Sequence, residues 1–297
     1  MSVTLIAVVI ALLLGHLAQP FVAALRQYDW YADWLRWLSA RFGEGSVWRG
    51  RYGIAIALAV PLLVVGLFQV ALDAPLLGLV GLLFAVAVLV YAWGPRDLDL
   101  DVDAITATTD PVARREAAAR LWPAGQEPLM DGASLVEAVF RNAQRRWFGV
   151  LFWFLLLGPV GAMLYRLSVL SVEGEMASQL PAATAEGARR LLAVLDWPVA
   201  QLMTLAMALV GNFDTVFSAW REAGGTRFRL DTGFLAHVAR ASVRVELAEE
   251  AEEYAEEGMV QAMRDLPELR DAMSLVWRIL LLWLGVLALL VLAGWAT

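Results

Sequence analysis

The chain has 297 residues, of which 60% are hydrophobic and 18% are charged. Soluble domains are about 45–50% apolar, so this composition excludes an ordinary soluble globular protein. The formal net charge of −7 argues against a nucleic-acid partner, and the absence of cysteine excludes disulfides, thiolate metal sites and cysteine nucleophiles.

The hydrophobic residues are gathered in long apolar runs. A helix needs roughly 17–25 residues to cross the hydrocarbon core of a bilayer. Five runs reach this length, at residues 3–25, 54–72, 76–93, 148–170 and 275–296. A sixth run, 191–210, is long enough but carries Asp196 and Pro198. None of the runs alternates in polarity as barrel strands do.

We therefore expect an all-α, polytopic integral membrane protein with five to six transmembrane helices. These helices, with helical cytoplasmic segments between them, are expected to form a single membrane domain over residues 1–297. The first run is expected to be a retained span, because no basic residue precedes it and no clean small-residue cleavage site follows it. The lipid bilayer is then a partner of the chain.

The distribution of arginine, which supplies all 23 basic residues, predicts the topology, because cytoplasmic loops collect positive charge. The turn at 73–75 and the segment 171–188 contain no arginine and are expected outside. The alternation requires 191–210 to cross the membrane; if that run only dips in, the arginine-rich segment after it would lie outside. Three arginine-rich segments are expected in the cytoplasm: 26–53, 94–147 and 211–274.

The first cytoplasmic segment contains an expected amphipathic helix at 27–38. Trp30, Tyr31, Trp34 and Leu35 fall on one helical stripe, with arginines nearby in the sequence. This pattern is typical of a helix that lies in the membrane interface. A helix packed on the protein's own loops is an equal alternative.

The second cytoplasmic segment begins with four aspartates, at 97, 99, 101 and 103. Their period of two indicates a short extended stretch or a solvated acidic face, and oxygen ligands of this kind could also hold Mg²⁺. Asp110 and Pro111 then mark the start of a helix over 112–121, with Asp110 as its cap.

A further helix is expected over 134–146, leading directly into the run at 148–170. Glu137 and Arg141 are four residues apart in it and can pair. Asn142, Arg145 and Arg146 follow at the expected membrane surface. The arginines are explained either as a positive anchor with snorkelling side chains or as a site for an anionic ligand, since guanidinium forks suit phosphate and carboxylate.

Few polar residues lie within the apolar runs, and the informative ones are His16, Gln19, Arg166 and Asp196. Such groups are costly in hydrocarbon and often functional. His16 and Gln19 share one face of the first helix, where such pairs commonly bond neighbouring helices. Asp196 precedes Pro198, which is expected to break or kink its helix. A broken helix with a carboxylate is typical of an ion or substrate site, and equally of a helix start capped by Asp196.

The stretch 246–257 holds seven glutamates and no basic residue. A solvated cytoplasmic face is the simplest interpretation, with arginines of other loops, a cation or a basic partner as alternatives. No phosphate-binding loop, dinucleotide fingerprint, zinc motif or nucleophile elbow is present, and the only histidines are His16 and His237. We therefore expect no catalytic residue, no metal site and no cofactor.

The stretch VEAVFRNAQRRWFGVLFWFLLLGPVGAMLYR, residues 136–166, resembles the central signature of the CobD/CbiB superfamily of membrane proteins. Glu137 and Asn142 match the family's glutamate and asparagine, the triplet at 151–153 matches Leu-Phe-Trp, and the glycines at 158 and 161 match its glycine-rich turn. The resemblance implies an enzyme that makes adenosylcobinamide phosphate by ATP-dependent amide formation. It is strong over 135–166 and weaker over the rest of residues 10–212.

Several acidic positions of that signature are changed here. Arg141 replaces a glutamate, and Arg145 and Arg146 replace an Asp-Gly pair, while Leu192 and Ala193 replace paired aspartates. Carboxylates suited to Mg²⁺–ATP are thus lost, in part to positive charge. These changes, with the stretches LLAVLDWPVAQL and ALVGNFDTVFSAW, are similar to the AmpE branch of the superfamily.

The AmpE resemblance implies a multi-pass protein of the bacterial inner membrane with a regulatory or accessory role. It links the chain to cell-wall recycling, to β-lactamase induction and to a cytoplasmic amidase of the AmpD type. We expect action by binding rather than catalysis, with a muropeptide or an anionic lipid as ligand. Two alternatives stay open: a synthase with a redesigned site, and a transporter or flippase built around His16, Gln19 and Asp196. The expected ligand-binding residues are Glu137, Arg141, Asn142, Arg145 and Arg146.

Overall fold

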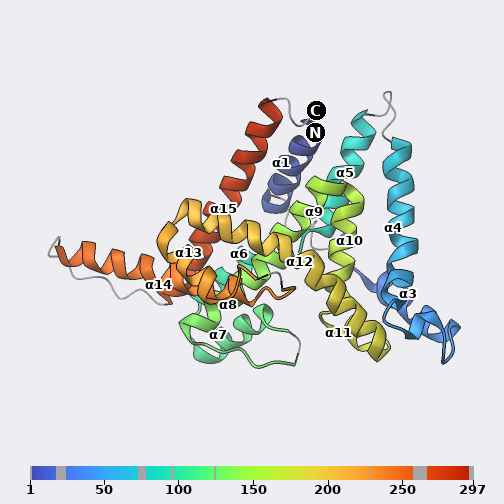
Figure 1. Ribbon diagram of the computed structural model, residues 1–297, viewed down its shortest axis with the longest axis horizontal. Helices are drawn as coiled ribbons and strands as arrows, with labels where there is room; N and C mark the ends of the chain where they lie inside the picture. Colours follow the sequence, from blue (N-terminus) through green and yellow to red (C-terminus); the bar gives the residue numbers. More distant parts are fainter. Residues whose placement is uncertain are drawn as a thin grey trace. The chain divides into compact units, whose positions relative to one another are not determined.

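The computed structural model describes residues 2–17, 25–72, 78–94, 97–123, 125–227, 229–256 and 266–293. These residues form helices joined by turns, and no strand is found among them (Figure 1). The predicted all-α class is confirmed. Contacts divide the chain into two compact units, and the expected single domain stays a prediction. The first unit comprises Met1–Arg96, Arg145–Leu195 and Leu287–Thr297, and the second comprises Asp97–Gln144 and Asp196–Val286.

Three of the described helices are long and apolar enough to cross a membrane: α4 (Gly53–Leu72), α12 (Ala182–Val210) and α15 (Pro267–Leu292). Their 20, 29 and 26 residues meet the ~20 that a hydrocarbon core requires. The apolar helices α1 (Ser2–Leu17) and α5 (Gly78–Ala92) are shorter, with 16 and 15 residues. Transmembrane character is therefore supported, whereas the described helices do not reach five to six spans.

In the first unit, α5 packs against α1 and α4, and α3 (Asp29–Arg41) packs against α4. Tyr31, Leu35 and Leu38 of α3 are buried in a core that also contains Trp48 and residues of α4 and α12. Their spacing of three to four residues confirms the helix expected over 27–38. One face of this helix thus packs on the protein itself.

The run at 148–170 forms two helices instead of the expected single span. Gly158, with a φ of +70°, ends α9 (Gly149–Leu157), and Pro159 begins α10 (Pro159–Leu170) at a position where a missing N–H is tolerated. At 1.5 Å per residue, the two helices are about 14 and 18 Å long, less than the ~30 Å hydrocarbon core. Neither α9 nor α10 is long enough to cross a membrane alone.

The helices α9 and α10 run side by side in opposite directions, and we call the pair the α9–α10 hairpin (Figure 1). Gly149 at the start of α9 lies against the ring of Tyr165 near the end of α10. Nearer the turn, Gly161 lies against the backbone carbonyl of Trp153. A Cβ at Gly161 would fall 1.9 Å from that oxygen, so the close approach requires glycine.

Gln69 of α4 holds the tip of the hairpin. Its amide nitrogen donates to the carbonyl of Leu157 at 3.2 Å, and its amide oxygen accepts from the N–H of Val160 at 3.1 Å. Both backbone groups lie at the break between the two helices, where intrahelical partners are missing. Irregular backbone at membrane depth is tolerated only where such groups are satisfied, and Gln69 satisfies them.

The base of the hairpin is fixed by charged side chains. Arg145, before α9, forms an ion pair with Glu173, after α10. The buried Arg166 donates to the carbonyl of Ala92 at 2.5 Å and to the carbonyl of Arg146 at 3.5 Å. The chain therefore enters and leaves the hairpin at the same place.

Helix α12 continues through Pro198 without ending. Asp196 lies inside this helix with 3% of its surface exposed, so it is neither the cap of a helix start nor placed at a helix break. Near the start of α12, the hydroxyl of Thr184 donates to the carbonyl of Trp48, and Gly187 lies against the carbonyl of Arg51. The first turns of α12 thus contact the loop that precedes α4.

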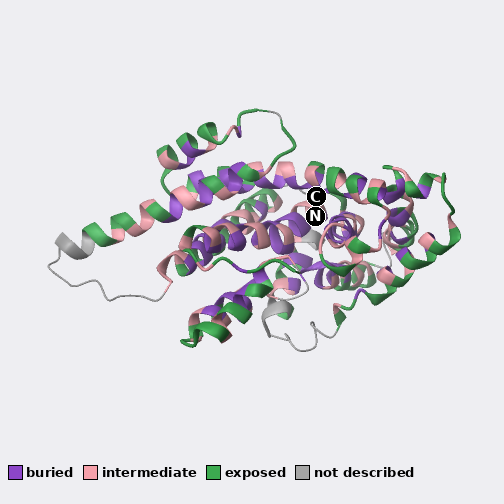
Figure 2. Ribbon diagram, turned by 90° about the horizontal axis from the view of Figure 1, so that it is seen from below, coloured by how far each residue is buried: buried purple, intermediate pink, exposed green. Residues whose placement is uncertain are grey.

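The second unit is built from α6 (Leu98–Ala107), α7 (Pro111–Ala118), α8 (Gly132–Ala143), α13 (Phe213–Glu222) and α14 (Gly233–Glu256), with most of α15. Helix α14 packs against both α8 and α13. Its first turns are buried and its later turns become exposed, as Figure 2 shows.

Side-chain caps begin three helices of this unit. Asp110 accepts from the N–H of Ala113 at 3.0 Å, and Pro111 is the first residue of α7, as predicted. Asp131 accepts from the N–H of Ser134 at 2.9 Å at the start of α8. The third cap is Asn212, which accepts from the N–H of Thr215 at 3.1 Å before α13.

Of the four alternating aspartates, Asp97 precedes α6 and the other three lie in its first turns, so of the two alternatives the extended stretch is wrong. Leu98, Asp101, Val102 and Ile105 are buried, which is the spacing of one helical face. The indole N–H of Trp277 donates to Asp99 at 2.9 Å. The helical period of the apolar residues between the aspartates decides the structure here.

Candidate functional site

Glu137, which matches the glutamate of the CobD/CbiB resemblance, lies on α8 and forms an ion pair with Arg240 of α14. The two side-chain atoms are 3.5 Å apart, and the side chains are 43% and 40% exposed. Glu137 is thus linked to a second helix, and its expected pairing with Arg141 along the same helix stays a prediction. Glu137 therefore belongs to the contact between α8 and α14.

Arg141 and Asn142 turn toward the end of the preceding helical segment. Both donate to the carbonyl of Leu121, at 3.3 Å and 2.8 Å. Asn142 also donates to the carbonyl of Ala138 at 2.8 Å. Leu121 ends the short 3₁₀ helix that follows α7, where carbonyl groups lack partners within the helix. Both side chains thus hold this connection to α8.

Arg145 and Arg146 lie in a π-helical turn, Gln144–Phe148, between α8 and α9. The boundary of the two compact units falls between Gln144 and Arg145, so these two arginines belong to the first unit. Arg145 pairs with Glu173, and Arg146 is 8% exposed with its aliphatic stem against Gly94. Ligand binding by the predicted set stays a prediction.

The predicted intramembrane polar residues are only partly described. His16 lies in α1, but its side chain is outside the described part, and Gln19 lies outside the described residues altogether. Asp196 is buried in α12, and its backbone carbonyl accepts from the amide of Gln144 at 3.0 Å.

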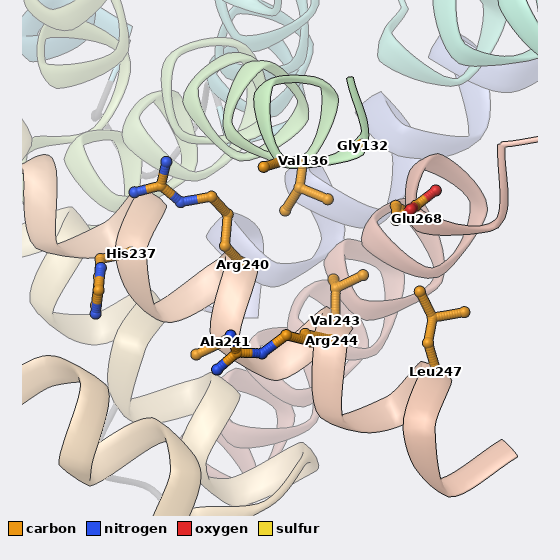
Figure 3. A pocket seen from close by; sticks show the side chains of 10 residues that line it. Gly132, Val136, His237, Arg240, Ala241, Val243, Arg244, Leu247 and Glu268 are labelled. Carbon is orange, nitrogen blue, oxygen red and sulfur yellow. The ribbon is translucent and has the colours of Figure 1, made fainter. Parts of the chain in front are cut away.

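The second unit contains a cavity of about 500 Å³ beside Glu137. We call it the α8–α14 cavity. Figure 3 shows Arg240 and Arg244 reaching toward the side of His237, with Glu268 at the opposite side of the view. Its lining residues come from three helices: Gly132, Ala133 and Val136 of α8; His237, Arg240, Ala241, Val243, Arg244 and Leu247 of α14; and Glu268 of α15.

The α8–α14 cavity combines apolar walls with two guanidinium groups. Arg240 and Arg244 are one turn apart on α14, and Glu268 is the one carboxylate among the lining residues. The cavity also lies at the N-terminal end of α8, where backbone N–H groups favour anions. A planar guanidinium binds carboxylate or phosphate through paired hydrogen bonds. The arrangement suits an amphipathic ligand with an anionic group.

The N-terminus of α8 is organised by two features next to this cavity. Hydrogen bonds from the side chain and then the backbone of Ser134 hold the pKa of Asp131 below its ordinary value. Gly132 approaches Glu268 so closely that a Cβ would lie 2.5 Å from its carboxyl carbon. The helix start and α15 are thus brought together by the absence of a side chain.

Sequence analysis did not identify Arg240 and Arg244. The available signal was the spacing of His237, Arg240 and Arg244, which places three basic-type side chains on one helical face. No cluster of three histidine, aspartate or glutamate side chains suited to a metal ion occurs within the described residues.

Comparison with known proteins gives one distant relative. No family model matches the chain, and no solved structure matches it. It is similar to the cobalamin biosynthesis protein CobD of Chromobacterium violaceum, with 28% identity over 198 residues. This match suggests the CobD/CbiB superfamily. It covers 64% of this chain and 63% of the relative, so the chain spans just under two thirds of that CobD protein.

Proposed function

We propose that this chain is an AmpE-like member of the CobD/CbiB superfamily that binds an anionic ligand at the α8–α14 cavity and lacks the synthase reaction. The observation that carries the proposal is the pair of arginines on the apolar wall of that cavity, next to Glu137. The CobD match and the three apolar helices support a membrane protein of this superfamily.

The loss of synthase chemistry is supported by what the motif residues do. Glu137 faces Arg240, and Asn142 donates to two backbone carbonyls. A site for Mg²⁺ and a triphosphate needs carboxylates that are open to the metal. In this chain, the matching positions are engaged in protein contacts or occupied by arginine.

The ligand class follows from the chemistry of the cavity. Val136, Val243 and Leu247 offer apolar contact, while Arg240 and Arg244 offer paired donors. A muropeptide or an anionic lipid has both an anionic group and less polar parts. A location in the bacterial inner membrane, a role in cell-wall recycling and β-lactamase induction, and a partner of the AmpD type rest on the AmpE resemblance alone.

We also propose a topology with four crossings, in place of the five to six expected from run lengths. Because Arg145 and Glu173 meet at the base of the hairpin, the segments before and after it share one side of the membrane. If the arginine-rich residues 211–274 are cytoplasmic too, α12 does not cross. The crossings are then the runs at 3–25 and 76–93, the second of which contains α5, and the helices α4 and α15.

The binding proposal is tested by native mass spectrometry of the purified protein with a muropeptide fragment and, separately, with Mg²⁺–ATP. We expect the muropeptide to bind and the double variant Arg240→Gln/Arg244→Gln to weaken binding by about tenfold or more, since charge-assisted hydrogen bonds contribute roughly 1.5–3 kcal/mol. The control is Arg227→Gln/Arg229→Gln, which neutralises two exposed arginines of the same unit away from the cavity. Equal loss in both variants would contradict the assignment.

The match to a cobalamin biosynthesis protein favours one second candidate, an ATP-dependent synthase. Retention of ATP with Mg²⁺, followed by its hydrolysis, would support that enzyme and overturn the proposed loss of synthase chemistry. Absence of nucleotide binding, together with muropeptide or anionic lipid binding, supports the binding protein.

A further inference from the structure

An apolar groove of about 590 Å³ lies between α3 and α4 in the first unit. We call it the α3–α4 groove. Asp33 is the one charged residue among those that line it, and the rest are aromatic or aliphatic. The groove is lined by Trp30, Asp33, Trp34 and Trp37 of α3, by Val60, Pro61, Val64 and Val65 of α4, and by Met163 of α10.

Pro61 explains why α3 lies where it does. Proline has no N–H, so the carbonyl of Ala57, four residues earlier, loses its partner within α4. The indole N–H of Trp34 donates to that carbonyl at 2.9 Å. The carbonyl freed by Pro61 and the indole of Trp34 thus join α4 to α3 at one wall of the groove.

Other contacts hold the rest of this wall in place. The ring of Trp37 stacks on Trp34 with 5.2 Å between centroids and 11° between planes. The indole N–H of Trp30 donates to the hydroxyl of Tyr91 at 2.6 Å, and the buried Tyr31 bonds Ser171 at 2.7 Å. Stacking and hydrogen bonds therefore hold the α3 wall of the groove against the rest of the first unit.

The open side of the groove continues into the exposed surface of α4. Val60 and Val64 of the groove are 52% and 46% exposed, and Trp37 is 54% exposed. Leu63, Leu67 and Phe68 extend the same apolar surface along the helix, at 61%, 62% and 55% exposure. Only 17% of the apolar window of α4 is buried within the protein. For a helix that crosses a membrane, this surface faces lipid hydrocarbon.

We propose that the α3–α4 groove binds one acyl chain of a membrane phospholipid. The chain lies against Val60, Val64 and Met163 and passes between the rings of Trp30 and Trp37. Tryptophan at such positions belongs to the level of the headgroups. The headgroup then lies along the polar side of α3, beside the ion pair of Asp33 with Arg36. This site is separate from the α8–α14 cavity and does not depend on the function proposed for it.

The occupant is hydrocarbon because the groove offers almost no hydrogen bonds. Trp34 has already donated its N–H to Ala57, and Trp30 has donated its N–H to Tyr91. A peptide or a sugar in the groove would lose hydrogen bonds to water without replacement. An acyl chain loses none, and it fills apolar volume that water would otherwise occupy.

The test is the phospholipid that remains with the full chain after gentle detergent extraction, measured by native mass spectrometry. We expect bound phospholipid on the natural protein and its loss from Val64→Trp, because the larger ring fills the groove. The matched control is Val70→Trp, which adds the same ring on the same helix at a residue that is 77% exposed and outside the groove. Equal phospholipid on both variants, or none on the natural protein, would overturn the proposal.

A second measurement needs no substitution. A phospholipid with a photoreactive group in its acyl chain is incorporated into bilayers with the natural protein, and the crosslinked residues are mapped. We expect adducts concentrated on Trp37, Val64 and Met163. Adducts spread evenly over Leu63, Leu67 and Phe68 as well would indicate ordinary bilayer contact and no bound chain.

Discussion

Gly161 illustrates how a missing side chain permits a fold at the scale of one residue. It lets α10 approach the carbonyl of Trp153, and Gly149 does the same for the ring of Tyr165. Both contacts join the two arms of the α9–α10 hairpin. The hairpin therefore depends on two glycines, of which Gly161 was expected in a glycine-rich turn and Gly149 was not singled out by the sequence.

Gly161→Ala is expected to destabilise the protein by about 1–3 kcal/mol, as an overpacked contact does. The new Cβ would overlap a backbone oxygen, which has little freedom to move. Thermal unfolding of the detergent-solubilised protein measures the change. Gly285→Ala is the control, because no atom lies within 4 Å of its added Cβ and alanine favours helix. A melting temperature lowered by the same amount in both variants would argue against the hairpin contact.

At the scale of elements, the sequence predicted helix starts, which depend on neighbouring residues, but not which helices pack together. Asp110 and Pro111 predicted the start of α7, because a cap bonds an N–H three residues away. Glu137, in contrast, forms an ion pair with Arg240, which is about a hundred residues away in the chain. No pattern within one helix reveals such a partner, and this is why the α8–α14 cavity was not predicted.

Two elements were misread for a related reason. The aspartates of α6 have a period of two, but the buried residues among them have the helical period, and burial decides the structure. The run at 148–170 has the length of a span, yet Gly158 and Pro159 reverse its direction. A Gly-Pro pair inside an apolar run indicates either a kink or a turn, and the choice depends on Gln69 from another helix.

Asp131 gives a prediction for the start of α8. Asp131→Ala is expected to lower stability by about 1 kcal/mol, and Asp131→Asn to retain most of it, because asparagine also caps helices. Since the pKa of Asp131 lies below its ordinary value, its charge stabilises the folded state above that value. This contribution is lost as the pH falls through the lowered pKa. Unfolding of the three proteins across the acidic range measures it, and a pH dependence unchanged in Asp131→Asn would contradict the assignment.

At the scale of the molecule, the proposed topology rests on the arginine distribution and on the hairpin together. Each run that is counted as a crossing moves all later segments to the opposite side of the membrane. If the hairpin returns to the side from which it enters, the segment 171–188 lies on the same side as the arginine-rich segments. The proposed topology thus leaves no arginine-rich segment outside, which agrees with the distribution of positive charge.

The absence of cysteine makes this topology directly testable. Ser178→Cys, at the exposed end of the short helix α11 (Glu175–Ser178) after the hairpin, is expected to react with an impermeant maleimide only after the cells are opened. Ser46→Cys, in the first arginine-rich segment, should behave in the same way. Ala74→Cys, in the arginine-free stretch 73–75 outside the described residues, should react in intact cells. Labelling of Ser178→Cys in intact cells would show that 148–170 crosses the membrane.

The hydrogen bonds of Gln69 to the hairpin tip also bear on the order in which the helices enter the membrane. The two backbone groups at the tip of the hairpin bond Gln69 of α4, which precedes them in the chain by 88 and 91 residues. We expect α4 to be in place when the hairpin is made, so that its tip finds a hydrogen-bonding partner. A chain without Gln69 would lack this partner for the hairpin tip. We expect the translocon to insert its apolar run 148–170 as an ordinary stop-transfer segment.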